Sequence, residues 1–166
     1  MSASTTAIRR RERTMIQTIL AATLIAGSLD ITAAFISTYI RGNQPIKVLY
    51  YIASGVFGKD TAYNSGSGMA VLGLAIHYLI AFLFTLLLFF VYPTVKSFLK
   101  NKFLIGVLYG IFVWAMMNKI VLPMSNVPLF KPSLQSMIIA CLILIFCIGI
   151  PIAWIVDTFY TRRTIK

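Results

Sequence analysis

Four long apolar runs dominate the chain, and short polar segments separate them. A helix of about 20 residues crosses a hydrocarbon core about 30 Å thick, and each run reaches that length. The pattern predicts helical spans at residues 15–40, 68–92, 103–122 and 134–156. We therefore expect an all-α fold, an integral membrane four-helix bundle.

Three prolines lie at or near the ends of the predicted spans. Proline lacks a backbone N–H and its ring clashes with the preceding turn, so it ends or kinks a helix. We expect Pro93 to end the second span and Pro123 to end the third. Pro151 should kink the fourth span near its cytoplasmic end.

The longest polar connection, between the first and second spans, contains a further helical pattern. Apolar residues recur at helical spacing between Pro45 and Gly58, for example at Ile46, Leu49 and Val56. A proline at the start and a glycine at the end are typical helix boundaries. A helix this short cannot cross a bilayer, so we expect an interfacial helix that packs against the bundle.

Composition supports a membrane location. Hydrophobic residues make up 59% of the 166 residues and charged residues 11%, with a mean hydropathy of +0.87. A soluble domain of this length cannot bury so much apolar surface, whereas lipid can cover it. The first run is too long for a signal-peptide core and contains an acid, so we expect it to be retained.

The net charge of +11 indicates orientation rather than a nucleic-acid partner. The basic residues lie in the short segments beside the spans, and no basic face or reading motif accompanies them. Four lie before the first span, three between the second and third and three after the fourth, against five on the other side. We therefore expect a cytoplasmic N-terminal segment (1–14), a membrane domain (15–156) and a polar cytoplasmic tail at the surface (157–166).

Two polar residues stand out inside the spans. Asp30 lies about ten residues from the end of the first span, and His77 lies about nine residues into the second, so both sit roughly 15 Å deep. Small residues surround each at helical spacing, which is typical of close helix–helix contact. An acid at this depth faces protein or water rather than lipid. We expect the two side chains to lie within reach of a hydrogen bond or one bridging water.

Three interpretations of that pair stay open. A buried polar pair holds two helices in register, or it carries protons in a transporter, or it binds a ligand. One histidine and one aspartate are too few ligands for a metal site, so no metal and no cofactor are expected. Asn118, about one turn inside the third span, is a further candidate for lining an outward-facing vestibule.

Other features point to packing rather than chemistry. Gly106 and Gly110 have the GxxxG spacing that lets another helix approach closely. Cys141 and Cys147 lie on different faces of one helix and are expected to act as small apolar side chains. No sequence motif of a hydrolase, kinase or metalloprotease occurs, so we expect the protein not to be an enzyme.

Several segments together resemble a family of small bacterial inner-membrane proteins with four predicted spans and no established activity. The matching segments are GSLD (27–30), VLYYIASG (48–55), LGLAIHY (72–78), YG (109–110), MN (117–118), VLPMS (121–125) and IGIPIA (148–153). The resemblance implies an inner-membrane location and the same four-span plan, and it implies no reaction. Tyr50 departs from the family pattern, in which glutamine is typical.

Two functional hypotheses follow. The first is a non-enzymatic membrane component that packs against a second copy of the chain or against another membrane protein. The second is a small proton-coupled transporter or exporter that uses Asp30 and His77. In both, the lipid bilayer is a partner and nucleic acid is not. Water around Asp30 favours transport, whereas a dry and tightly packed pair favours a structural role.

Overall fold

The structure is a computed structural model that describes residues 14–127 and 133–164. Its elements are α1 (Met15–Ile40), α2 (Ile46–Phe57), α3 (Lys59–Asn64), α4 (Gly68–Phe98), α5 (Lys102–Met116), η1 (Met117–Val121), α6 (Leu122–Met124), α7 (Leu134–Leu144), η2 (Ile145–Gly149) and α8 (Ile150–Thr164). All of the regular structure in the described ranges is helical. The predicted all-α class is confirmed.

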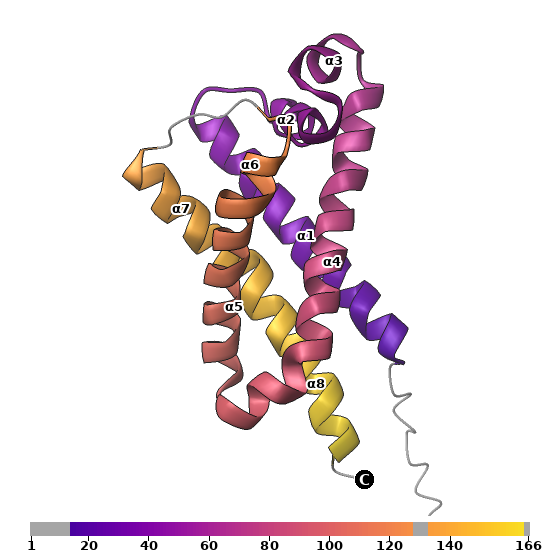
Figure 1. Ribbon diagram of the computed structural model, residues 1–166, viewed down its shortest axis with the longest axis vertical. Coiled ribbons are helices and arrows are strands. Elements are labelled where there is room, and N and C mark those ends of the chain that lie inside the picture. The colour runs from indigo at the N-terminus through magenta and orange to yellow at the C-terminus, as the bar shows by residue number, and fades with distance from the viewer. Residues whose placement is uncertain (1–13, 128–132, 165–166) are drawn as a thin grey trace, which may run out of the picture.

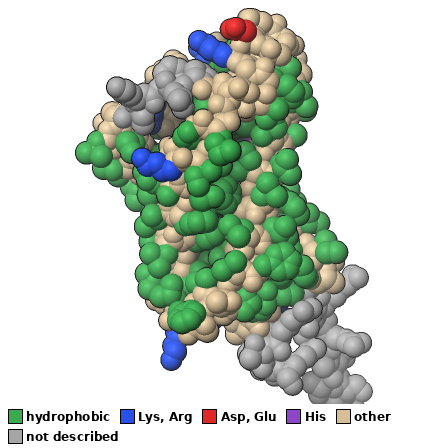
Figure 2. Space-filling view, in the orientation of Figure 1, with side chains coloured by type: hydrophobic (Ala, Val, Ile, Leu, Met, Phe, Trp, Pro, Cys, Tyr) green, Lys and Arg blue, Asp and Glu red, His purple; other side chains and the backbone are tan. Residues whose placement is uncertain are grey.

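Within residues 14–127 and 133–164, four helical segments are long and apolar enough to cross a membrane. They comprise α1, α4, the run from α5 to α6, and the run from α7 into α8. Apolar side chains cover the middle of the molecule, and the Lys and Arg side chains in view gather toward its two ends (Figure 2). This distribution is that of a multi-pass membrane bundle, because lipid covers the apolar belt and water reaches the charged ends.

The bundle has two distinct ends (Figure 1). The start of α1, the turn between α4 and α5 and the end of α8 lie at one end, which we call the terminal end. Helices α2, α3 and α6 lie at the other, the α2–α3 end. A capping box starts α1, in which the Thr14 side chain accepts from the Gln17 N–H and the Gln17 side chain accepts from the Thr14 N–H. The apolar run therefore becomes helical directly after the basic segment.

Pro93 acts differently from what the sequence predicts. Helix α4 continues through Pro93 to Phe98, so the prediction that Pro93 ends this span is wrong. Pro93 has no N–H to donate to the Phe89 carbonyl four residues earlier. The Tyr160 hydroxyl donates to that carbonyl instead, at 3.0 Å. A side chain from α8 thus satisfies the group that proline leaves without its usual donor.

The other two prolines each follow a wide π-helical turn. Turn η1 ends two residues before Pro123, and turn η2 ends two residues before Pro151. The third span then ends at Met124, one residue after Pro123, which agrees with the prediction. Turn η2 is a local irregularity just before Pro151, where the missing N–H interrupts the normal ladder of backbone hydrogen bonds. The kink expected at Pro151 stays a prediction.

The third and fourth spans pack at very short range through glycines. A Cβ atom on Gly110 would lie 2.5 Å from the Ile145 Cα, and one on Gly106 would lie 2.8 Å from the Ile150 Cα. Both neighbours are backbone atoms, which a side-chain rotation cannot move away. The GxxxG spacing therefore serves contact between α5 and the η2–α8 region within one chain.

The predicted interfacial helix is present as α2. Helix α2 lies at the α2–α3 end and packs against α4. Gly73 of α4 makes this close contact possible, because a Cβ atom at position 73 would overlap the Leu49 carbonyl of α2. Ala53 and Ser54 are fully buried. The short α3 that follows Gly58 was not predicted.

Candidate functional site

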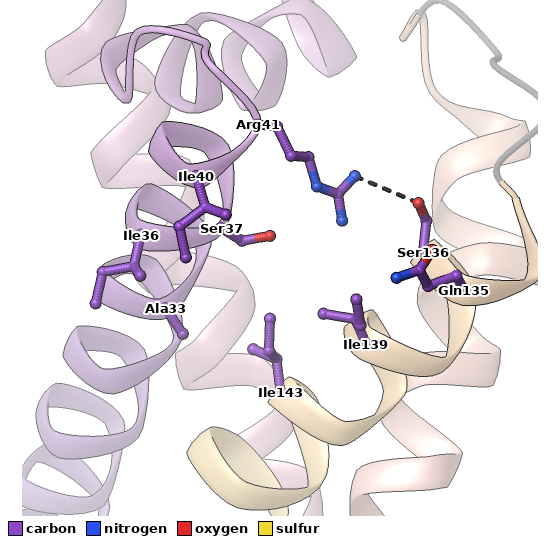
Figure 3. Close-up of a pocket in the computed structure, with 9 residues that line it drawn as sticks. All are labelled: Ala33, Ile36, Ser37, Ile40, Arg41, Gln135, Ser136, Ile139 and Ile143. Carbon is purple, nitrogen blue, oxygen red and sulfur yellow. Dashed lines mark hydrogen bonds between the residues drawn. The ribbon is translucent and has the colours of Figure 1, made fainter.

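A groove separates α1 from α7 toward the α2–α3 end of the bundle. Figure 3 shows side chains of the two helices facing each other across an open space. That space is a cavity of about 620 Å³, lined by Ala33, Ile36, Ser37, Ile40, Arg41, Gln135, Ser136, Ile139 and Ile143. The walls are apolar along most of their length and polar at the mouth.

A second cavity of about 290 Å³ adjoins the first on the side of the bundle interior. Ser37, Arg41, Ile139 and Ile143 line both cavities, so the two lie directly side by side. The inner cavity adds Asp30 and residues of α2 and α7 to the lining. We call the whole space the α1/α7 groove.

Among the described residues that line the groove, Arg41 at its mouth is the one cation. Arg41 is the residue that ends α1, and its Nη1 donates to the Ser136 Oγ at 3.4 Å (Figure 3). Ser133 caps α7 and its hydroxyl donates to Ser136 at 3.0 Å, so the polar rim is built from the start of α7. Within the described ranges, the ion pairs involve only Asp157, and none reaches Arg41.

Asp30 faces the inner part of the groove. Its side chain is half-buried and lines the inner cavity. No donor among residues 14–127 and 133–164 forms a hydrogen bond or an ion pair with its carboxylate, and His77 lies within electrostatic range. An acid that lines a cavity without a donor can meet water or a ligand there.

His77 has a different environment from Asp30. It is buried, and its Nε2 lies 2.8 Å from the Gly27 carbonyl oxygen. A carbonyl only accepts, so Nε2 carries the hydrogen. We expected the two side chains within reach of a hydrogen bond or of one bridging water, and no direct hydrogen bond joins His77 to Asp30 among the described residues. A contact through one water stays a prediction.

A second hydrogen bond reinforces this contact between α1 and α4. The Tyr78 hydroxyl and the Ser28 hydroxyl lie 2.8 Å apart, one residue further along each helix. Ala22 and Ala26 of α1 are completely buried. Together with the His77 bond, these contacts hold α1 and α4 in register, as small residues and interhelical hydrogen bonds do in membranes.

Asn118 does not join the other two candidates. It lies in the η1 turn, and its Nδ2 donates to the Trp114 carbonyl of the same helix at 2.9 Å. The three polar residues singled out from the sequence therefore have three separate environments. Only Asp30 lines the α1/α7 groove.

An ionic cluster that was not predicted lies at the terminal end of the bundle. Asp157 is 7% exposed, whereas we expected it to begin a surface tail; that expectation is wrong for Asp157. Its carboxylate accepts from the Tyr92 hydroxyl at 2.9 Å and from the Lys96 ammonium, and it lies 3.7 Å from the Lys102 ammonium. Helix α8 continues past it to Thr164.

The sequence does hold a signal for this cluster. Tyr92 and Lys96 are four residues apart and so share one face of α4, and Lys102 begins the next helix after a short turn. Asp157 is the one acid near the same end among the described residues. The Lys102 ammonium also lies 4.2 Å from the centre of the Trp154 ring. These contacts tie α4, α5 and α8 together.

No set of metal ligands is assigned. Within residues 14–127 and 133–164, no three His, Cys, Asp or Glu side chains lie together in a way that would hold a metal ion. Among the described residues, the ionisable groups that line the α1/α7 groove are Asp30 and Arg41.

The fold and the groove together define the chain as a multi-pass helical membrane protein. Comparison with protein-family models, with curated proteins and with solved structures finds no match. The resemblance drawn from the sequence segments thus stays a prediction, and the molecule's function is argued from its own residues.

Proposed function

We propose that this chain is a non-enzymatic component of the bacterial inner membrane that binds an apolar group of a partner molecule in the α1/α7 groove. One observation carries the proposal: α1 and α7 are held apart by two adjoining cavities, whereas neighbouring helices are in close contact. A space lined by Ile36, Ile40, Ile139 and Ile143 is suited to an alkyl chain or an apolar side chain.

The surroundings of the groove support a bilayer-derived partner. Ile36, Ile40 and Ile139 are exposed on the surface of two membrane spans, where lipid is the solvent. A partner can therefore enter from the side without crossing water. We infer from the excess of Lys and Arg beside the chain ends that the terminal end is cytoplasmic. The groove lies toward the α2–α3 end and so belongs to the periplasmic half of the bundle in this orientation.

Filling the groove tests the proposal. A fatty acid bearing a photoreactive diazirine, added to membrane vesicles, is expected to label Ile139 and Ile143 more strongly than the ordinary lipid-facing Leu79. Ala33→Trp should lower labelling of the two isoleucines several-fold and leave Leu79 unchanged. Val71→Trp, on an exposed face of α4, is the matched control and should change neither. Equal labelling in Ala33→Trp and the wild type would refute groove binding.

A second candidate function, proton-coupled transport, is favoured by the position of Asp30. Its carboxylate lines the inner cavity and has no hydrogen-bond donor among the described residues, so it is available to water and to a proton there. In proteoliposomes with a pH-sensitive dye inside, Asp30→Asn should abolish any proton flux that the wild type carries, because an amide cannot cycle a proton. Asp60→Asn, in the exposed α3, is the control. Equal flux in the wild type and Asp30→Asn would reject this candidate.

A further inference from the structure

The guanidinium of Arg41 has unused hydrogen-bonding capacity at the end of a span. Arg41 is exposed and follows the last residue of α1, so it lies at the depth where lipid headgroups begin. An arginine side chain has five N–H donors, of which one meets Ser136 at the long distance of 3.4 Å. No other partner is found for this guanidinium among residues 14–127 and 133–164.

The space beneath Arg41 is apolar and runs toward the bilayer centre. Figure 3 shows Ile36 and Ile40 on α1 and Ile139 and Ile143 on α7 around it. The lining extends eight residues down α1 from Arg41 to Ala33, which corresponds to about 12 Å of helix. Asp30 does not line this larger cavity, so an alkyl chain there avoids the carboxylate.

We propose that the α1/α7 groove binds an anionic phospholipid. Its phosphate oxygens accept hydrogen bonds from Arg41 and Ser136, and one acyl chain lies along the four isoleucines. This inference rests on the proposed function and names the ligand of the same groove. Arginine donors arranged as a fork match phosphate geometry, and such charge-assisted bonds are the stronger kind.

Charge complementarity selects this occupant over others. The bilayer supplies phosphate groups at the depth of Arg41, whereas free phosphate would leave the apolar part of the groove without a ligand. The mouth has a cation and no acid in an ion pair with it in the described ranges. A headgroup with net negative charge is therefore favoured over a zwitterionic one, because the positive amine of a zwitterionic headgroup repels the same guanidinium.

Lipid titration with native mass spectrometry tests the inference. The delipidated protein in detergent is titrated with phosphatidylglycerol and, separately, with phosphatidylcholine of the same acyl chains. We expect one tightly held phosphatidylglycerol, with an affinity about fivefold above that for phosphatidylcholine, since one basic residue near the surface contributes about that factor. Arg41→Gln should remove the preference. Lys47→Gln, which removes the same charge from an exposed site nearby, should keep it.

The outcomes separate the two proposals. If both lipids bind equally and Arg41→Gln changes nothing, while Ala33→Trp still blocks binding, the headgroup assignment fails and the groove function stands. If Ala33→Trp changes neither the binding of either lipid nor the oligomeric state, the groove function fails as well. Ala33→Trp could instead convert a dimer to a monomer without changing lipid retention. That result would place a second copy of the chain in the groove and would overturn the lipid assignment.

Discussion

Replacing Asp157 with alanine removes the acceptor that holds three side chains at the terminal end of the bundle. The Tyr92 hydroxyl is fully buried and donates to the carboxylate at 2.9 Å. A hydrogen bond to a charged group contributes about 1.5–3 kcal/mol to stability. The side chains of Lys96 and Lys102 are 36% and 32% exposed, so solvent screens each ion pair to about 1 kcal/mol or less.

Asp157→Ala should therefore lower the free energy of unfolding by about 2–4 kcal/mol. Asp157→Asn keeps an oxygen acceptor for Tyr92 and should cost about half as much. The measurement is reversible unfolding in mixed micelles of a mild detergent and sodium dodecyl sulfate, followed by far-ultraviolet circular dichroism. Trp154 fluorescence provides a local signal, since Lys102 lies over that ring.

A double-mutant cycle sharpens the test. Tyr92→Phe removes only the hydroxyl, so its coupling energy with Asp157→Ala isolates this hydrogen bond and should be about 1 kcal/mol or more. Asp60→Ala removes an exposed acid at the opposite end and should change stability by less than about 0.5 kcal/mol. If Asp157→Ala is as mild as Asp60→Ala, the cluster does not stabilise the bundle.

Three further predictions concern the rest of the fold. Reporters fused after Lys166 and within the segment 96–102, between the second and third spans, should both give cytoplasmic signals, because that side carries more Lys and Arg. A periplasmic signal from either would reject the orientation. Gly110→Leu should prevent the close approach of α5 to Ile145 and lower expression or thermal stability markedly, whereas Leu108→Ala on the exposed side should be mild; equal effects would contradict the glycine contact. His77→Phe should cost about 0.6–1.7 kcal/mol through loss of the bond to Gly27, and an unchanged unfolding midpoint would argue against the register role.

The sequence by itself determined how deep each part of the chain lies in the membrane. Several helix boundaries agree with the predictions. Helices α1, α4 and α7 begin at Met15, Gly68 and Leu134, and α2 has the bounds Ile46–Phe57. Hydrocarbon demands long apolar helices, so hydropathy and length fix the spans almost without regard to tertiary contacts. The same spacing argument placed Asp30 and His77 at similar depth.

Only the tertiary structure decided how the helices are rotated and which groups meet. Spacing along a helix sets depth but not the direction in which a side chain points toward a neighbouring helix. His77 therefore bonds Gly27 while Asp30 faces the α1/α7 groove. Contacts between segments far apart in the chain decide three further features. They separate α1 from α7, they place Asp157 beside two lysines, and they let Tyr160 donate to the carbonyl that Pro93 leaves without its usual donor. Such contacts follow from side-chain packing between spans. The apolar pattern does not specify this packing, because lipid and the protein interior are equally apolar.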